Sequence, residues 1–179
     1  AHLLNLKHRV GNIMGSDRQT KSTIGVNATS RHGLAYARHL QIKEQPMKDC
    51  LFCKIIDGEI PSYKIYEDEY VYAFLDIACD VYGHTLVIPK CHATNVLDCD
   101  KLYLDKVIEA VQKIAKHYVD DLGYDGVNIL NASGAAAEQS VFHLHFHVIP
   151  RKNGDGVKAW PFHDKHEYDL AAICDEFKM

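Results

Sequence analysis

The stretch HLHFHVIPR, residues 143–151, places three histidines at every second position between bulky apolar side chains. A period of two is the repeat of a β-strand. The sequence therefore predicts that the three imidazoles share one face of a strand, with neighbours about 6.5–7 Å apart. Leu144, Phe146 and Val148 are expected to pack as core on the opposite face. Buried imidazoles need hydrogen-bond partners or a metal ion. From the residues alone, a metal site and covalent catalysis with a histidine nucleophile both remain open.

The patterns on either side of this stretch predict an antiparallel sheet with one long helix. Runs rich in aromatic and β-branched residues predict five strands, at 63–68, 70–77, 84–90, 126–131 and 140–150. Residues 100–123 repeat apolar side chains at three- and four-residue steps between an aspartate cap and a glycine, which predicts a helix. Short terminal helices are expected at 50–58 and 168–177. The predicted fold class is therefore α+β.

Charge divides the 179 residues into two parts. Residues 1–46 carry seven Lys or Arg and two Asp or Glu, a balance of +5, whereas residues 47–179 carry thirteen and twenty-two, a balance of −9. We therefore expect a basic leader that ends before Met47, followed by one domain. The leader is interpreted as disordered. Its origin stays open between a cloning-derived or mistranslated extension, an organelle transit peptide and a basic arm for nucleic acid. The acidic domain itself is not expected to bind a nucleic acid polymer.

Cysteine usage and hydropathy bear on the compartment. The chain has six cysteines, and it shows neither a secretory signal nor an apolar run of membrane-spanning length. We expect a reducing, cytoplasmic setting, or an organelle if the leader is a transit peptide, and no contact with a membrane. Cys50 and Cys53 form a C-x-x-C pair, which offers half of a four-ligand zinc site or, alternatively, a redox pair.

Several blocks around the three histidines resemble the histidine-triad (HIT) superfamily, whose signature alternates three histidines with hydrophobic residues. The blocks CLFCKIIDGEIP, AFLDI, GHTLVIPK, NASG and QSVFHLHFHVIPR follow one another in the family's order over residues 50–151. The chain is similar to the Hint branch and, within it, to bacterial-type proteins that keep a C-x-x-C. The resemblance implies a homodimer that joins two five-stranded sheets.

The resemblance also implies an enzyme that binds a purine nucleotide such as AMP or GMP and cleaves a bond at its α-phosphate, usually P–N in the Hint branch. His145 would attack the phosphorus and form a nucleotidyl-histidine intermediate, which water hydrolyses. A backbone carbonyl would accept the ring proton of His145, and we expect His147 to supply that carbonyl. His147 would also contact the phosphate or the leaving group, with Ser140 and Gln139 helping to orient or protonate that group.

Further residues are assigned to the nucleotide by the same resemblance. Asp76 resembles the carboxylate that accepts the ribose hydroxyls, and Asn131 resembles a loop asparagine near the phosphate. The apolar pocket around the base maps to Phe52, Ile55, Ile60, Phe74 and Leu86. The complete set of expected nucleotide contacts also includes Ser140, Val141, His145 and His147.

The resemblance divides the histidines of the triad between two tasks. The ligands of a structural zinc ion map to Cys50, Cys53, His92 and His143, with Cys91 as a rival ligand. His84 is interpreted as a residue that holds the triad in place.

One departure from the family bears on the substrate. Glu138 stands where a glycine usually precedes the glutamine, and glycine there allows a positive φ or a close approach of backbone to phosphate. The carboxylate would either repel an anionic substrate or contact a cationic leaving group. Three functions stay open: a nucleoside phosphoramidase, a dinucleoside polyphosphate hydrolase of the Fhit type, and a nucleotide-binding regulatory module with little catalysis.

Overall fold

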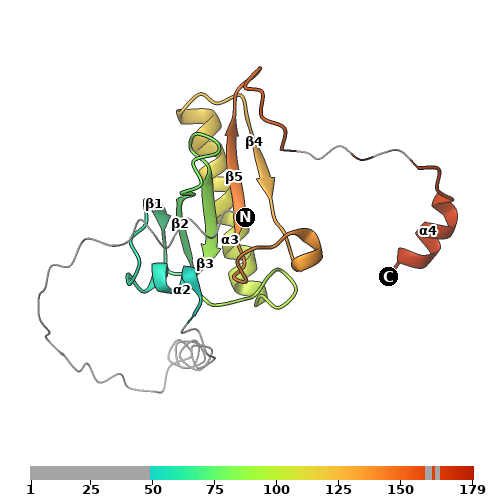
Figure 1. Ribbon diagram of the computed structural model, residues 1–179, viewed down its shortest axis with the longest axis horizontal. Coiled ribbons are helices and arrows are strands. Elements are labelled where there is room, and N and C mark those ends of the chain that lie inside the picture. Colours follow the sequence, from blue (N-terminus) through green and yellow to red (C-terminus); the bar gives the residue numbers. More distant parts are fainter. Residues whose placement is uncertain (1–48, 160–162, 164–165) are drawn as a thin grey trace, which may run out of the picture.

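The sheet has five antiparallel strands in the spatial order β1-β2-β3-β5-β4 (Figure 1). The computed structural model describes residues 49–159, 163 and 166–179, so the predictions for the leader lie outside the described residues. The strands are β1 (Lys64–Glu67), β2 (Val71–Leu75), β3 (Thr85–Pro89), β4 (Gly126–Leu130) and β5 (Phe146–Arg151). The predicted α+β class and the five strands are confirmed.

Within the described residues, one long and two short α-helices accompany the sheet: α2 (Leu51–Ile56), α3 (Lys101–Lys116) and α4 (Leu170–Phe177). Asp100 caps α3, because its carboxylate accepts the backbone N–H of Leu102. The helix continues as a π-helical turn, η2 (His117–Asp121), and the chain then turns at Gly123, whose φ is +69°. A 3₁₀ turn, η3 (Ala135–Ala137), lies between β4 and β5. No helix in the described part of the chain is both long and apolar enough to cross a bilayer.

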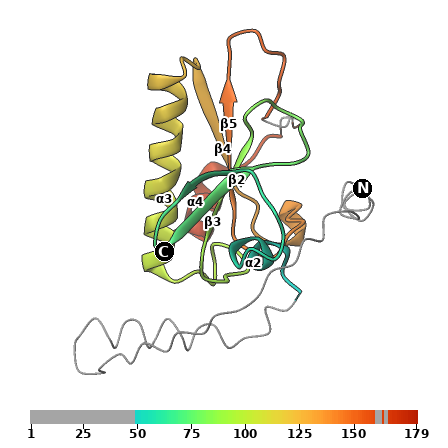
Figure 2. The same cartoon turned by 90° about the vertical axis from the view of Figure 1, so that its left-hand side faces the viewer.

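The two faces of the sheet carry two separate apolar clusters, and Figure 2 shows α3 and α2 on opposite sides of it. Side chains alternate along a strand, so β2 and β3 contribute to both clusters. The cluster under α3 includes Val71, Ala73, Val87, Val107, Val111, Ile114 and Val148. The cluster under α2 contains Phe52, Ile55, Phe74, Leu86 and Ile88. Leu144 and Val148 are fully buried and Phe146 packs under α3, which confirms their predicted place in the core.

The fifth strand begins later than predicted. We predicted a strand over 140–150, but β5 starts at Phe146, so only His147 of the three histidines lies in a strand. His143 and His145 lie in the bend that precedes β5. The prediction that all three share one strand is therefore wrong.

Backbone hydrogen bonds explain the late start. The N–H of Leu144 donates to the carbonyl of Ala93 at 2.7 Å, and the N–H of His143 donates to the carbonyl of Val141 at 2.9 Å. Donors used in this way cannot extend the ladder toward β3, which itself ends at Pro89, a residue without an N–H. The result is a bend that turns His143 away from the strand.

Candidate functional site

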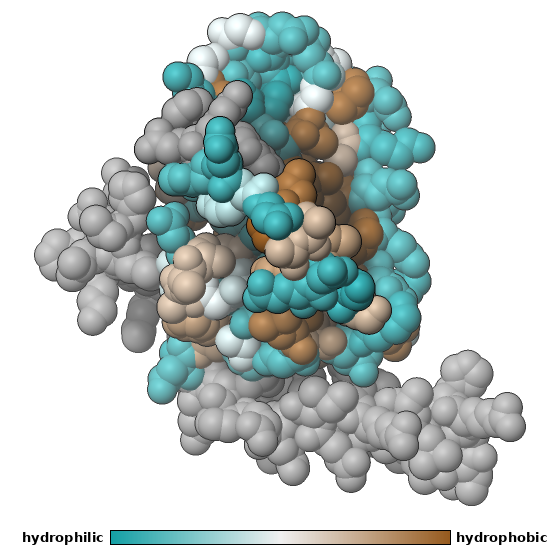
Figure 3. All heavy atoms as spheres, turned by 90° about the vertical axis from the view of Figure 1, so that its right-hand side faces the viewer, coloured by the Kyte–Doolittle hydropathy of each residue, from teal (hydrophilic) through white to brown (hydrophobic). Residues whose placement is uncertain are grey.

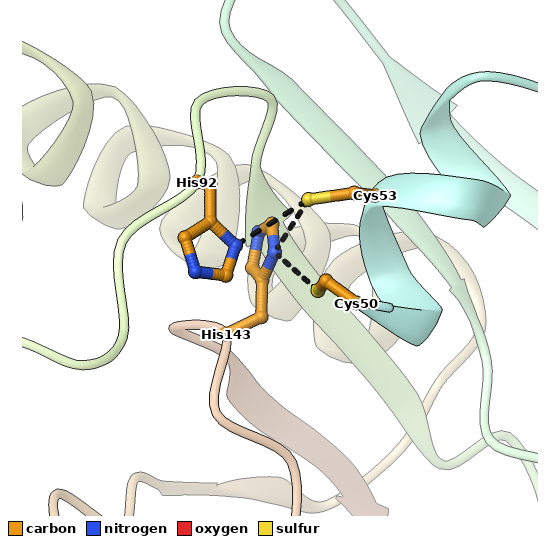
Figure 4. Close-up of side chains that lie close together, drawn as sticks. All are labelled: Cys50, Cys53, His92 and His143. Atoms are coloured by element: carbon orange, nitrogen blue, oxygen red, sulfur yellow. Dashed lines mark hydrogen bonds between the residues drawn. The ribbon is translucent and has the colours of Figure 1, made fainter. Parts of the chain in front are cut away.

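The four residues assigned to zinc meet in one cluster, which Figure 4 shows between α2 and the segments that follow β3 and precede β5. Cys50 Sγ lies 3.4 Å from His143 Nδ1. Cys53 Sγ lies 3.4 Å from His92 Nδ1 and 3.5 Å from His143 Nδ1. Sulfur and nitrogen ligands of one tetrahedral zinc ion stand about 3.6 Å apart, given Zn–S of about 2.3 Å and Zn–N of about 2.0–2.1 Å. The donor set and its separations therefore fit zinc.

Residues around the cluster set the tautomer of His143 and the ionisation of Cys50, two of its four ligand residues. His143 is fully buried, and its Nε2 lies 3.0 Å from the carbonyl oxygen of Pro89. That acceptor holds the proton on Nε2 and leaves the lone pair of Nδ1 directed at the cysteines. The neighbouring Cys53 thiol, together with His143, lowers the pKa of Cys50, which favours the thiolate form of Cys50. The rival ligand Cys91 lies outside the cluster.

His145 is held in the tautomer that a nucleophile requires. Its Nδ1 lies 2.7 Å from the carbonyl oxygen of His143. A carbonyl can only accept, so Nδ1 carries the proton and Nε2 carries the lone pair. The expectation that His147 supplies this carbonyl is wrong, because the bend before β5 brings the carbonyl of His143 to the ring. Asn131 donates from Nδ2 to the carbonyl of His145 at 2.9 Å and so fixes the same bend.

His147 lies beside His145, with ring centres 5.0 Å apart, and continues into a chain of polar contacts. Its Nδ1 lies 2.8 Å from His84 Nε2, and His84 Nδ1 lies 2.8 Å from Asp80 Oδ1. His84 therefore contacts the triad, as interpreted from the sequence. Asp80 was not identified from the sequence, because nothing in an exposed loop aspartate four residues before a histidine distinguishes it from an ordinary turn residue.

The titration of His147 gives a prediction about stability. Burial, followed by the neighbouring His145 and His84, lowers the pKa of His147 to about 4. An unfolded histidine titrates near about 6.5, so between these values the unfolded chain binds more protons than the folded protein. The contribution of His147 to the free energy of unfolding is therefore complete above about pH 6.5 and is lost as the pH falls toward about 4.

We expect the wild-type protein to lose more of its free energy of unfolding over this interval than a His147→Gln variant, in urea melts at a series of pH values. Acid release of a metal ion would affect both proteins alike. Parallel losses in the two proteins would contradict the assignment.

The apolar residues assigned to the base lie on the α2 face of the sheet. Phe52 and Phe74 meet edge to face with ring centres 5.5 Å apart. Ile55 and Leu86 are buried in the same cluster, with Ile60 and Val141 packed against it. Phe52 also meets the ring of His145 at 5.4 Å and that of His143 at 5.8 Å. One side chain of α2 thus lies against the Cys/His cluster, the apolar cluster and His145.

Gln139 shapes the loop before β5. Its Oε1 accepts the N–H of Gly134 at 2.7 Å, and its Nε2 donates to the carbonyls of Thr94 at 2.6 Å and Val141 at 3.0 Å. The amide thus bonds three backbone groups of the fold, which holds the loop in place. Ser140 follows it and is exposed. Their roles toward a leaving group stay predictions.

Glu138 adopts the backbone conformation for which glycine is suited, with φ +64° and ψ +23°. A residue with a Cβ in this left-handed region is strained by roughly 1–2 kcal/mol. Glycine avoids this strain, but it loses more conformational entropy on folding, which offsets part of the gain. We expect Glu138→Gly to raise the free energy of unfolding by about 0.5–1 kcal/mol in urea melts. Glu138→Ala keeps the Cβ and serves as the control. Equal stability of the two variants would contradict a backbone origin.

Comparison with known proteins identifies the class of protein. Residues 57–154 match the HIT domain, and the chain belongs to the HIT family. "Protein hit" of Bacillus subtilis is 51% identical over 118 residues, which are 65% of this chain and 81% of that protein. "Adenosine 5'-monophosphoramidase HNT1" of Saccharomyces cerevisiae is 40% identical over 114 residues, 63% of this chain and 70% of that protein.

Solved structures agree with this assignment. A HIT-family protein from Bacillus subtilis is 48% identical with a TM-score of 0.63, covering 72% of this chain and 94% of that one. A zinc-bound histidine triad family protein from Mycobacterium smegmatis is 41% identical with a TM-score of 0.60, covering 65% and 85%. The predicted resemblance to bacterial HIT proteins is confirmed.

Proposed function

We propose that this chain is a nucleotidyl hydrolase that cleaves at the α-phosphate of nucleoside phosphoramidates or related AMP conjugates. One observation carries the proposal: His145 is buried, its Nδ1 proton is bound by the carbonyl of His143 at 2.7 Å, and its Nε2 lone pair is left for attack. Burial also lowers the pKa of His145, which keeps the ring neutral and nucleophilic near pH 7. The name of the yeast relative, a monophosphoramidase, points to the same chemistry.

The proposed reaction has two steps. His145 Nε2 forms a bond to the α-phosphorus as the P–N bond breaks, and the departing amine takes a proton, so a nucleotidyl-histidine remains. Water then attacks the phosphorus, AMP leaves, and His145 regains its lone pair. Asp76, which follows β2, is assigned to the ribose hydroxyls, and the apolar cluster around Phe52 and Phe74 to the base.

The test is AMP release by the full chain from adenosine 5′-phosphoramidate, measured beside cleavage of diadenosine polyphosphates. Faster release from the phosphoramidate is the expected result. Preference for the dinucleotide would instead favour the Fhit-type hydrolase, and AMP binding without turnover of either substrate would favour the regulatory module.

We also propose that Cys50, Cys53, His92 and His143 bind a structural zinc ion. The support is the fit of the donor separations to a tetrahedral ion, together with the zinc-bound relative from Mycobacterium smegmatis. The ion would fix the start of α2 to the segment that carries His143 and so hold Phe52 against His145.

A homodimer is proposed as the working form. β4 is an edge strand, and its Ile129 is 47% exposed. Figure 3 views the molecule from the side on which both β4 and α4 lie, and it shows apolar residues gathered among polar ones there. An exposed apolar edge favours pairing with a second copy. Sedimentation equilibrium of the full chain tests for the mass of two chains.

A further inference from the structure

His84 stands between an acid and a histidine of the triad. Asp80 Oδ1 lies 2.8 Å from its Nδ1, and His147 Nδ1 lies 2.8 Å from its Nε2. His84 is buried at 6% exposure, whereas the Asp80 side chain is 56% exposed in the loop between β2 and β3. Both ring nitrogens of a buried imidazole are therefore used, one toward the protein surface and one toward the site.

The contact with Asp80 determines which ring nitrogens of His84 and His147 carry protons. An ionised carboxylate can only accept, so His84 Nδ1 carries a proton. When His84 is neutral, its Nε2 accepts from His147 Nδ1, and His147 Nε2 then bears a lone pair. When one proton is added, His84 donates from Nε2 to His147 Nδ1, and His147 Nε2 becomes a donor. In the second arrangement the positive charge of His84 lies directly against the carboxylate of Asp80.

A second carboxylate near the same nitrogen has a different place. Asp76 Oδ2 lies 3.8 Å from His84 Nδ1, beyond hydrogen-bond distance, while Asp80 makes the direct contact. Asp80 therefore occupies His84 Nδ1 and leaves Asp76 Oδ2 available to a ligand, while Asp76 Oδ1 accepts the N–H of Ala78. Without Asp80, Asp76 would be the nearest anion for His84, and the two tasks would compete for one group.

The alternative for this cluster is a second metal site, because Asp76, His84 and His147 offer three ligand atoms close together. The separation of the two imidazole nitrogens argues against it. His84 Nε2 and His147 Nδ1 are 2.8 Å apart, a hydrogen-bond distance, whereas two nitrogens on one tetrahedral zinc ion stand about 3.3 Å apart. A proton fits between these atoms better than an ion beside them.

We propose that Asp80 is a positioning residue that, through His84, sets His147 to donate a proton from Nε2 to the leaving group. The inference rests on the proposed function. As the P–N bond breaks, the leaving nitrogen takes the Nε2 proton of His147. His147 Nδ1 takes the Nε2 proton of His84. His84 keeps the proton on its Nδ1, which stays hydrogen-bonded to Asp80. The pair loses one proton and becomes neutral, and the leaving group gains that proton.

The experiment compares Asp80→Ala with the wild-type full chain on two AMP conjugates. Adenosine 5′-phosphoramidate has a basic leaving group that must be protonated, whereas AMP p-nitrophenyl ester has a leaving group that departs without a proton. We expect kcat for the phosphoramidate to fall about 10–100-fold with little change in KM, below the ~10²–10⁴-fold that a direct proton donor supplies. The ester is expected to react at nearly the wild-type rate. Asp80→Asn, which keeps an acceptor oxygen but no charge, is expected to lose part of the rate, and Asp80→Glu to regain some.

Asp121→Ala is the matched control. Asp121 also pairs with the Nδ1 of a histidine four residues away, His117, at 2.7 Å, on an exposed helix end outside the site. It is expected to leave both rates unchanged. Equal losses on both substrates in Asp80→Ala would show a role in loop structure alone and overturn the proposal, as would an unchanged phosphoramidate rate.

Nitrogen-15 NMR of labelled histidines separates failure of this inference from failure of the proposed function. In the free wild-type protein we expect His84 to carry protons on both Nδ1 and Nε2 and His147 to carry its proton on Nε2, and in Asp80→Ala we expect His84 to lose one of its two protons. This measurement needs no turnover. A protonation state of His84 that is the same in both proteins would overturn the role of Asp80, even if the enzyme proves active.

Discussion

A His145→Ala variant is expected to lose at least about 10³-fold in the rate of AMP release from adenosine 5′-phosphoramidate. The loss should be this large because the other two histidines of the triad are engaged in other contacts. His147 Nδ1 is bound to His84, and the Nδ1 of His143 is directed at the cysteines. AMP affinity should change far less, since the apolar cluster and Asp76 remain. Turnover by product assay and AMP binding by calorimetry measure the two effects separately.

A structural loss must be distinguished from a chemical one. Removing the ring leaves the carbonyl of His143 without its donor, at a cost of about 1–3 kcal/mol in the free energy of unfolding. Thermal melts of the variant therefore accompany the kinetics. His117→Ala, which changes an exposed histidine at the end of α3, is the control and should retain full activity. In rapid-quench experiments with labelled substrate, an acid-labile nucleotide adduct should form on the wild-type protein and be absent from His145→Ala. An adduct on the variant would assign the nucleophile to another residue.

The sequence predicted which residues form the site better than it predicted how those residues are arranged. Alternation from 143 to 148 correctly placed Leu144 and Val148 in the core, because exposing either side chain would leave a large apolar group in water. The same alternation wrongly extended β5 back through His143. Whether a backbone N–H joins the ladder depends on what else competes for it, and here the carbonyl of Ala93, some fifty residues earlier in the chain, takes the N–H of Leu144.

The contacts of Asp80 and Gln139 were unpredictable for a related reason. Neither residue type nor spacing shows that one exposed carboxylate reaches a buried imidazole, or that one amide closes a loop through three backbone groups. Glu138 is the opposite case. A glycine expected at that position pointed to a positive φ, and the observed φ of +64° follows from the turn that the loop makes, whichever side chain it carries.

Removal of zinc is expected to have the largest effect on stability. α2 has six residues and no side-chain cap at its start, so little within the helix itself stabilises it. Two of its connections to the rest of the fold are Cys50 and Cys53, and the others are apolar contacts such as Phe52. Loss of a bound metal is among the changes that cost several kcal/mol. If loss of the metal lowers the free energy of unfolding by at least about 3 kcal/mol, the Tm of a chain of this size should fall by roughly 10 °C.

Cys53→Ser and treatment of the wild-type protein with a strong chelator should give the same fall in Tm, and elemental analysis should find one zinc ion per chain only in the untreated wild type. Cys91→Ser tests the rival ligand and should keep both the ion and the Tm, since Cys91 lies outside the cluster. Phe52 bridges the cluster and His145, so loss of the ion should also slow AMP release, by displacing the ring that borders the nucleophile. A wild-type protein without zinc and with an unchanged melt after chelation would contradict the metal site. A chelated protein with lower Tm but full activity would contradict only the coupling through Phe52.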